Sequence, residues 1–160
     1  MSAARKTNAV RILESLGIPH DIAEHPVGEE HFDATHVAGL LGVEAGVLFK
    51  TLVARAGPEQ VFVFCIPGNA ELDLKKAARV AGARKVDLVP LKDLTPLTGY
   101  VRGGCSPIGM KKKFPTWIDE SCTALPQMYV NAGARGLQVV IAPDDLRRAA
   151  GADVADLCVR

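Results

Sequence analysis

Apolar residues at helical spacing recur in short segments, each bracketed by residues that favour the start or the end of a helix. Thr7 precedes one such segment as a potential N-cap and Gly17 follows it, while Pro143 suits the first turn of the last segment. The pattern predicts five short helices: 8–16, from Asp33 or Thr35 to Leu41, 74–81, a turn at 91–94, and 143–150.

A second pattern, short runs rich in β-branched and other apolar residues, predicts strands. We expect seven: 20–24, 47–55, 61–66, 85–89, 116–120, 128–131 and 137–141. The turn at 57–60 joins two of them as a hairpin. Because the strands come mostly as neighbours and do not alternate strictly with long helices, an α+β fold is favoured over a doubly wound one. We expect residues 1–160 to form a single domain, with a mixed, curled or barrel-like sheet and short flanking helices.

The composition is that of an ordinary globular protein, with 48% hydrophobic and 23% charged residues in 160. A net charge of +1 argues against a strongly basic nucleic-acid binder, so any contact with nucleic acid must come from a local patch. The N-terminal residues lack the apolar run of a signal peptide, and no stretch approaches the ~20 apolar residues that span a bilayer. We therefore expect a cytoplasmic protein with no membrane partner. Four widely spaced cysteines without a CxxC pair fit reduced thiols.

Residues 99–109, which read Gly-Tyr-Val-Arg-Gly-Gly-Cys-Ser-Pro-Ile-Gly, are the strongest candidate for a ligand-binding loop. Four glycines and a proline in eleven residues disfavour a regular helix or strand and let the backbone approach a ligand closely. The basic run Lys111, Lys112 and Lys113 follows, which suggests a ligand that is anionic at one end and carries a carbonyl at the other. These lysines, and Arg135 in a second glycine-bearing segment, either contact phosphates or serve only as solvated or ion-paired surface groups.

Lys50 lies in a predicted strand whose two faces are both largely apolar. Its ammonium is therefore held near an anion or a carbonyl, or it reaches solvent at a rim while its stem is buried. Cys105 and Ser106, in the glycine-rich loop, are candidate nucleophiles. The sequence ties no histidine to either of them, and a small buried cysteine is the commoner state.

Four histidines, His20, His25, His31 and His36, lie at spacings of five, six and five residues. No cysteine or carboxylate completes a recognised zinc pattern around them, so we expect no metal site. The chain also lacks the P-loop and GxGxxG patterns, so we expect no cofactor.

Three segments together resemble the YbaK family: Phe49-Lys50-Thr51-Leu52, the loop 99–109, and Gly133-Ala134-Arg135-Gly136-Leu137. This family comprises aminoacyl-tRNA deacylases that are related to the editing domain of bacterial prolyl-tRNA synthetase. The order and spacing of the motifs match over nearly the whole chain, and the branch that clears cysteine from mischarged proline tRNA is the most similar. The resemblance implies a mixed α/β fold with a curled sheet around the site.

The resemblance also implies a role for individual residues. Lys50 matches the essential lysine of the family, and Gly103 and Gly104 match the loop that faces the aminoacyl ester, so these three form the expected catalytic group. Two positions depart from the family pattern, with Asn131 where serine is frequent and His25 where tyrosine is frequent. Asparagine still offers a donor and an acceptor. The expected substrate pocket consists of His25, Phe32, Thr51, Cys105, Ser106, Asn131 and Gly133, and the expected tRNA contacts are Lys111, Lys112, Lys113 and Arg135.

For a cysteinyl ester, the resemblance implies that the thiol of the substrate attacks its own carbonyl, with prolyl-tRNA synthetase as a partner that presents the proline tRNA; no DNA partner is expected. The chief alternative is an alanyl-tRNA or broader deacylase that uses water. A non-catalytic module that binds tRNA or nucleotide is a second alternative, and a cysteine- or histidine-based metal protein is a third.

Overall fold

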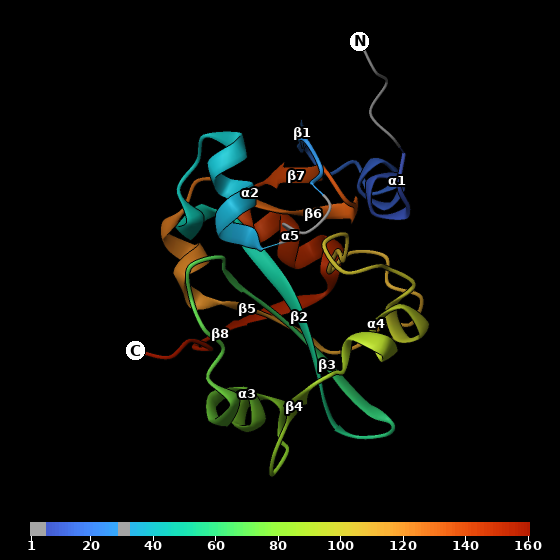
Figure 1. Cartoon of the computed structure of the whole chain (residues 1–160), viewed down its shortest axis with the longest axis vertical. Helices are drawn as coiled ribbons and strands as arrows, with labels where there is room; N and C mark the ends of the chain where they lie inside the picture. The colour runs from blue at the N-terminus through green and yellow to red at the C-terminus, as the bar shows by residue number, and fades with distance from the viewer. Residues whose placement is uncertain (1–5, 29–32) are drawn as a thin grey trace.

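The computed structural model describes residues 6–28 and 33–160, which form five α-helices and eight strands (Figure 1). The helices are α1 (Asn8–Ser15), α2 (Ala34–Leu41), α3 (Leu74–Ala81), α4 (Leu91–Thr98) and α5 (Pro143–Ala150). The strands are β1 (Asp21–Glu24), β2 (Phe49–Gly57), β3 (Gln60–Pro67), β4 (Asp87–Leu88), β5 (Thr116–Asp119), β6 (Met128–Ala134), β7 (Leu137–Ile141) and β8 (Ala152–Ala155). Two short 3-10 helices, η1 (Ala45–Val47) and η2 (Glu120–Ala124), precede β2 and β6.

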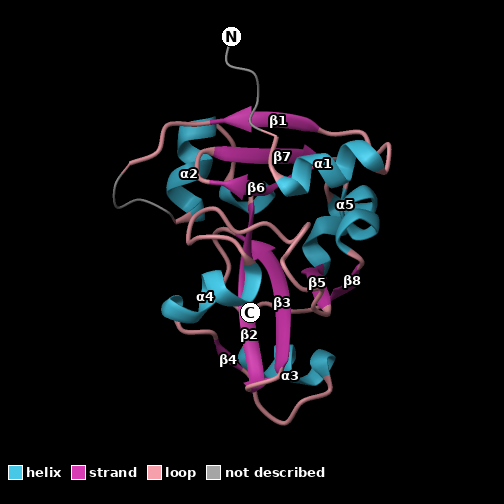
Figure 2. Ribbon diagram, turned by 90° about the vertical axis from the view of Figure 1, so that its right-hand side faces the viewer, coloured by secondary structure: helices cyan, strands magenta, loops and turns pink. Residues whose placement is uncertain are grey.

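The strands form two sheets, one of three strands in the order β1-β7-β6 and one of five in the order β4-β2-β3-β5-β8. All neighbours are antiparallel except β3–β5 and β5–β8, which are parallel. The predicted α+β class with a mixed sheet is confirmed, since the five-stranded sheet contains both parallel and antiparallel pairs. The strands do not make one closed barrel, because the two sheets are joined only by a single parallel bridge between Leu48 and Tyr129 among the described residues. Figure 2 shows the three-stranded sheet lying across one end of the β2–β3 hairpin.

The local signals predicted most helices well. The side chains of Thr7, Asp33 and Asp73 accept hydrogen bonds from backbone N–H groups at the starts of α1, α2 and α3. Helix α4 differs from the prediction, since it extends to Thr98 and contains Pro96. No helix in the described part of the chain is long and apolar enough to cross a membrane.

Alternation along β2 separates two packing environments. Leu52 and Ala54 point toward α3, where the indole of Trp117 stacks on Phe64 with ring centroids 5.5 Å apart. Val53 points to the opposite face and packs under the loop 99–109. Lys50 belongs to the first face by this alternation and Thr51 to the second. Two neighbours in a sequence motif therefore lie on different sides of the same strand.

Candidate functional site

The candidate site lies where the two sheets separate. Leu48, just before β2, makes a parallel bridge to Tyr129 of β6, and no further pairing joins these segments in the part of the chain described. The next residues on the same face of each strand are Lys50 and Asn131, both half-buried. We call this region, formed by Lys50, Gly68, Gly103 and Asn131, the β2–β6 junction.

The Lys50 ammonium is held beside a backbone carbonyl, as one of the two sequence interpretations expected. Lys50 Nζ donates a hydrogen bond to Gly68 O at 3.3 Å, and Thr35 Oγ1 of helix α2 lies 3.5 Å from the same oxygen. An ammonium has three N–H donors, and this contact uses one of them. The other two can therefore serve an anion or an ester oxygen.

Gly68 is a residue of the junction that the sequence analysis missed. A Cβ at this buried position would lie 2.7 Å from Ala34 Cβ and 3.0 Å from Leu48 O. Only glycine lets helix α2 pack this closely on the end of β3, beside the lysine. Its sole sequence signal is its place in a Pro67-Gly68 pair after the predicted strand 61–66, which any ordinary turn shares.

The side chain of Asn131 fastens the glycine-rich loop to β6. Its Oδ1 accepts hydrogen bonds from the backbone N–H groups of Gly133 and Ala134, at 2.6 and 3.1 Å. Its Nδ2 donates to Gly103 O at 3.0 Å and to Ala134 O at 3.1 Å. Both N–H donors and two acceptor sites of the amide are thus used within the protein. This geometry gives Asn131 the role of a latch, whereas the sequence analysis expected its donor and acceptor to serve the substrate pocket.

Glycines in the loop serve a tight turn and a close approach of two backbones. Gly103 has a φ of 78°, and Gly104 N donates to Val101 O at 2.9 Å, which closes a type II turn. A Cβ on Gly104 would lie 3.0 Å from Arg135 N and 3.2 Å from the carbonyl carbon of Ala134. The N–H of Gly104 is therefore committed to the turn, while the N–H of Gly103 has no acceptor in the described residues.

Gly133, expected in the pocket, shapes the segment that follows Asn131. Its φ of 98° strongly favours glycine, and a Cβ there would lie 2.9 Å from Cε1 of Tyr100. The Tyr100 hydroxyl in turn donates to Ile108 O at 2.7 Å. Gly133 therefore lets β6 pack on the ring that braces the glycine-rich loop.

The candidate nucleophiles lie away from Lys50. Cys105 is buried and packs against Val53 and Val63, on the other face of β2, and burial raises the pKa of its thiol to about 12. Ser106 has no exposed surface, and its Oγ accepts a hydrogen bond from Ile108 N at 3.1 Å. At neutral pH the Cys105 thiol is thus protonated, and neither side chain is placed to attack a ligand at the junction.

Thr51 lies on the same face of β2 as Val53, against which Cys105 packs. Its Oγ1 lies 3.9 Å from the Sγ of another buried cysteine, Cys65. All four cysteines are free, which is consistent with the predicted reduced thiols. Among the described residues, no group of three or more histidine, cysteine, aspartate or glutamate side chains could hold a metal ion.

His25 lies at the end of β1, on the same face as Asn131. Its Nδ1 is 3.0 Å from Pro26 O, and its Nε2 is 3.3 Å from Nε2 of Gln138, a residue of β7 that the sequence analysis did not single out. Gln138 is directly opposite Asn131 in the β6–β7 pair. The side chains of His25 and Gln138 therefore border the junction. Phe32, also expected in the pocket, lies outside the described residues.

The basic residues occupy two different places. Arg135 is exposed beside the junction, and its Nε donates to Arg102 O at 2.8 Å. Lys111, Lys112 and Lys113 are also exposed. Lys113 lines a separate pocket together with Ile12 of α1 and the end of α5. The structure therefore brings Arg135 close to Gly103 and leaves the three lysines on a neighbouring surface.

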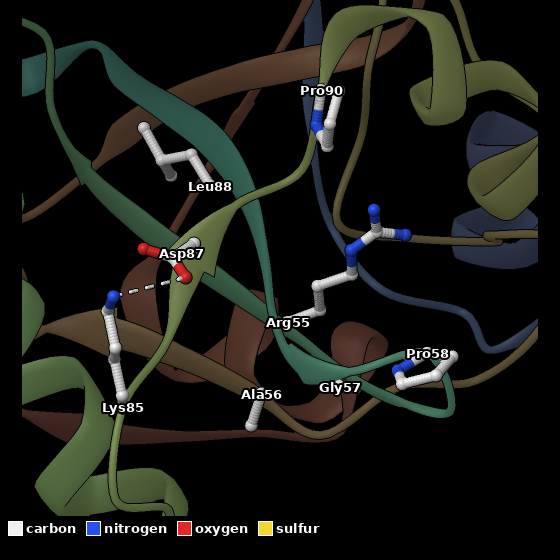
Figure 3. A pocket seen from close by; sticks show the side chains of 8 residues that line it. All are labelled: Arg55, Ala56, Gly57, Pro58, Lys85, Asp87, Leu88 and Pro90. Atoms are coloured by element: carbon white, nitrogen blue, oxygen red, sulfur yellow. Dashed lines mark ion pairs between the residues drawn. The ribbon is translucent and has the colours of Figure 1, made fainter.

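A separate cavity of about 480 Å³ lies at the far end of β2, beside the tip of the hairpin (Figure 3). Arg55, Lys85 and Asp87 border it, and the last two form an ion pair at 3.9 Å. Arg55 follows Lys50 by five residues, which in an extended strand is roughly 17 Å. This cavity is therefore distinct from the junction.

Comparisons with known proteins show which family this chain belongs to. The sequence profile of the aminoacyl-tRNA editing domain family matches residues 29–149. EbsC of Enterococcus faecalis, named as a proposed Cys-tRNA(Pro)/Cys-tRNA(Cys) deacylase, is 44% identical over 156 residues, which cover 98% of this chain and 95% of EbsC.

Solved structures have the same fold. The crystal structure of a proposed trans-editing enzyme for prolyl-tRNA synthetase has a TM-score of 0.83 at 28% identity, covering 98% of this chain and all of that one. A hypothetical protein of known structure has a TM-score of 0.87 at 24% identity, covering 96% of this chain and all of that one, and this likeness concerns the fold alone.

Proposed function

Because the chain belongs to the family of aminoacyl-tRNA editing domains, we propose that it is a trans-editing deacylase whose main substrate is Cys-tRNA(Pro). The observation that carries this proposal is the 44% identity with EbsC over nearly the full length of both chains. The junction with Lys50, Gly103 and Asn131 falls within the residues that match the family profile.

The ester bond of an aminoacyl-tRNA is already activated, so positioning and charge stabilisation suffice without a protein nucleophile. In the proposed reaction, the thiol sulfur of the cysteinyl group attacks its own carbonyl carbon. A C–S bond forms, the ester C–O bond breaks, and the thiol proton leaves with the 3′ oxygen of the tRNA. The products are a thiolactone, which water then opens to cysteine, and uncharged tRNA. The burial of Cys105 and Ser106 supports a reaction that uses neither of them.

The residues of the junction have separate roles in this proposal. Lys50 uses its two remaining N–H donors for a terminal phosphate or ribose oxygen, or for the oxygen that gains charge in the transition state. The N–H of Gly103 faces the ester carbonyl, and Asn131 holds that loop in position. Arg135 contacts phosphate near the acceptor end, and Lys111 to Lys113 contact the tRNA further away. With a net charge of +1, the chain has little non-specific affinity for tRNA, which favours delivery by prolyl-tRNA synthetase.

Single-turnover deacylation of cysteinyl-tRNA(Pro) and alanyl-tRNA(Pro) tests the proposal. We expect rapid loss of the cysteinyl ester alone, and Lys50→Ala to lower kcat/KM by at least about 100-fold. Lys92→Ala, at an exposed lysine of α4, is the matched control and should leave the rate unchanged. Equal loss of both esters would point to a water-using deacylase. If the wild type cleaves neither ester, the proposal is wrong and a tRNA-binding module is favoured.

A further inference from the structure

Gln138 is a polar residue in a fully buried strand. All five residues of β7 are buried, and Gln138 is 4% exposed. Its neighbours Leu137 and Val139 point into the main core, so its own side chain points to the opposite face. That face carries Asn131, directly opposite in β6, and Ala23, opposite in β1. Gln138 thus lies on the same face as the β2–β6 junction.

Hydrogen bonding fixes the orientation of the Gln138 amide. The carbonyl of Pro26 only accepts, so the His25 nitrogen that contacts it, Nδ1, carries the proton in the neutral ring. His25 Nε2 is then an acceptor, and Nε2 of Gln138 donates to it. The Gln138 carbonyl consequently points away from the histidine. This oxygen, Oε1, is buried and has no hydrogen-bond partner among residues 6–28 and 33–160.

A buried carbonyl oxygen without a donor is uncommon in native proteins, because it loses its hydrogen bonds to water and gains none within the protein. Asn131 cannot supply the donor, since both of its N–H groups are bonded to backbone carbonyls. The side chain of Gln138 therefore has one end bonded to His25 and one buried, unpaired acceptor, beside a junction that already holds a lysine. A ligand that brings its own N–H donors would satisfy this oxygen.

We propose that Gln138 is a specificity-determining residue of the deacylase and that its Oε1 accepts a hydrogen bond from the α-ammonium group of the bound aminoacyl ester. This inference rests on the proposed function. The α-ammonium is the one N–H donor that every aminoacyl ester shares and that a simple acyl ester lacks. A neutral amide oxygen binds it without an ion pair, which leaves Lys50 free for the phosphate or ester end. Gln138 thereby distinguishes aminoacyl esters from acyl esters and does not discriminate among amino-acid side chains.

The test compares cysteinyl-tRNA(Pro) with 3-mercaptopropionyl-tRNA(Pro), which keeps the thiol and lacks the ammonium. We expect the wild type to prefer the cysteinyl ester by about 10- to 100-fold in kcat/KM, the range for a hydrogen bond to a charged group. Gln138→Met, which keeps the length and unbranched shape of the side chain, should lower kcat/KM for the cysteinyl ester by that factor. It should leave the desamino ester unaffected. Gln127→Met, at an exposed glutamine, is the matched control and should keep the full preference.

Unfolding in urea gives a second readout that does not depend on activity. Gln138→Met also loses the hydrogen bond to His25, so the comparison is made in a His25→Phe background, where that bond is already absent. Because Oε1 has no partner among the described residues, Gln138→Met should then unfold at the same urea concentration as His25→Phe alone or at a higher one. A clear decrease would mean that the oxygen is paired before substrate binds, and would overturn the inference. An undiminished preference in Gln138→Met would also overturn it. If the wild type cleaves neither ester, the proposed function fails first, and the two failures are thus distinguishable.

Discussion

Replacing Asn131 with alanine removes all four hydrogen bonds of its side chain, and with them the link between β6 and the glycine-rich loop. In two of these bonds Oδ1 accepts from the N–H groups of Gly133 and Ala134, and in a third Nδ2 donates to the carbonyl of Gly103. A structural role for Asn131 predicts a loss of folding stability as well as activity. A role only as a pocket donor predicts a loss of activity alone.

The size of the effect follows from these contacts. A net contribution of about 0.5–1.5 kcal/mol for each hydrogen bond gives about 2–6 kcal/mol for four. Asn131 is half-buried, so water replaces part of the lost bonding, and we expect a decrease of about 2–4 kcal/mol in the free energy of unfolding. That is a large share of the roughly 5–15 kcal/mol that stabilises a typical domain.

Urea denaturation followed by circular dichroism measures this decrease, and deacylation measured well below the unfolding transition gives the effect on activity. Asn69→Ala is the matched control, since Asn69 is exposed and its side chain makes no hydrogen bond within the described residues. Asn131→Asp keeps the acceptor for Gly133 and Ala134 but turns an oxygen toward the carbonyl of Gly103. We expect it to lose activity like Asn131→Ala. Surface substitutions usually change the free energy of unfolding by about 0.5 kcal/mol or less. If the free energies of unfolding of Asn131→Ala and Asn69→Ala differ by no more than that, the latch is refuted.

Three further predictions follow from buried or crowded positions. Cys105→Ala should keep deacylation within about threefold of wild type, since a thiol of pKa about 12 is not a nucleophile at neutral pH; a loss beyond about 100-fold in a folded protein would contradict the thiol-assisted reaction. Burial alone would raise the pKa of Asp119, but hydrogen bonds to its carboxylate, one of them from Leu157 N, hold it below its usual value. The stability that it contributes is therefore present above the pKa of the unfolded chain and lost as the pH falls through the lower folded pKa. Asp119→Asn should flatten the acid limb of stability against pH, and an unchanged limb would count against it. Gly104→Ala should cost about 1–3 kcal/mol, because a Cβ would meet backbone at 3.0 Å, whereas Gly46→Ala, with nothing within 4 Å, should cost under 1 kcal/mol; equal costs would show that the loops are not in contact.

The helices were predictable because their signals are local. An N-capping side chain and a terminal glycine lie within one short segment, so α2 and α3 could be located from the chain alone. Strand β8 was not predicted, because it follows α5 directly and exists through parallel pairing with β5, far away in the sequence. Strand β4 is shorter than the predicted 85–89, because only two of its residues pair with β2.

The candidate site was only partly predictable for the same physical reason. Lys50 stood out because a charged residue in an apolar strand needs a partner, but the partner, Gly68 O, is a backbone atom that carries no sequence signal. The expected pocket placed Thr51 and Cys105 with Lys50, and strand alternation puts them on the opposite face. Gln138 was missed because its position opposite Asn131, which places it on the face of the junction, is set by the pairing of β6 with β7.

The place of the junction follows from where sheet pairing stops. Strand β2 has β3 along one side. On the other side, β4 pairs with it at Ala54 and Arg55, and β6 bridges to Leu48 just before it. Between these contacts, at residues 50–52, β2 has a free edge within the described residues. Such an edge normally invites pairing with another chain. Here the Lys50 ammonium and Thr35 of helix α2 both contact the carbonyl of Gly68. In the proposed function, the free edge faces an aminoacyl ester, which carries a carbonyl and N–H donors of its own. The proposed reaction needs no reactive protein side chain, which is consistent with the burial of Cys105 and Ser106 away from Lys50.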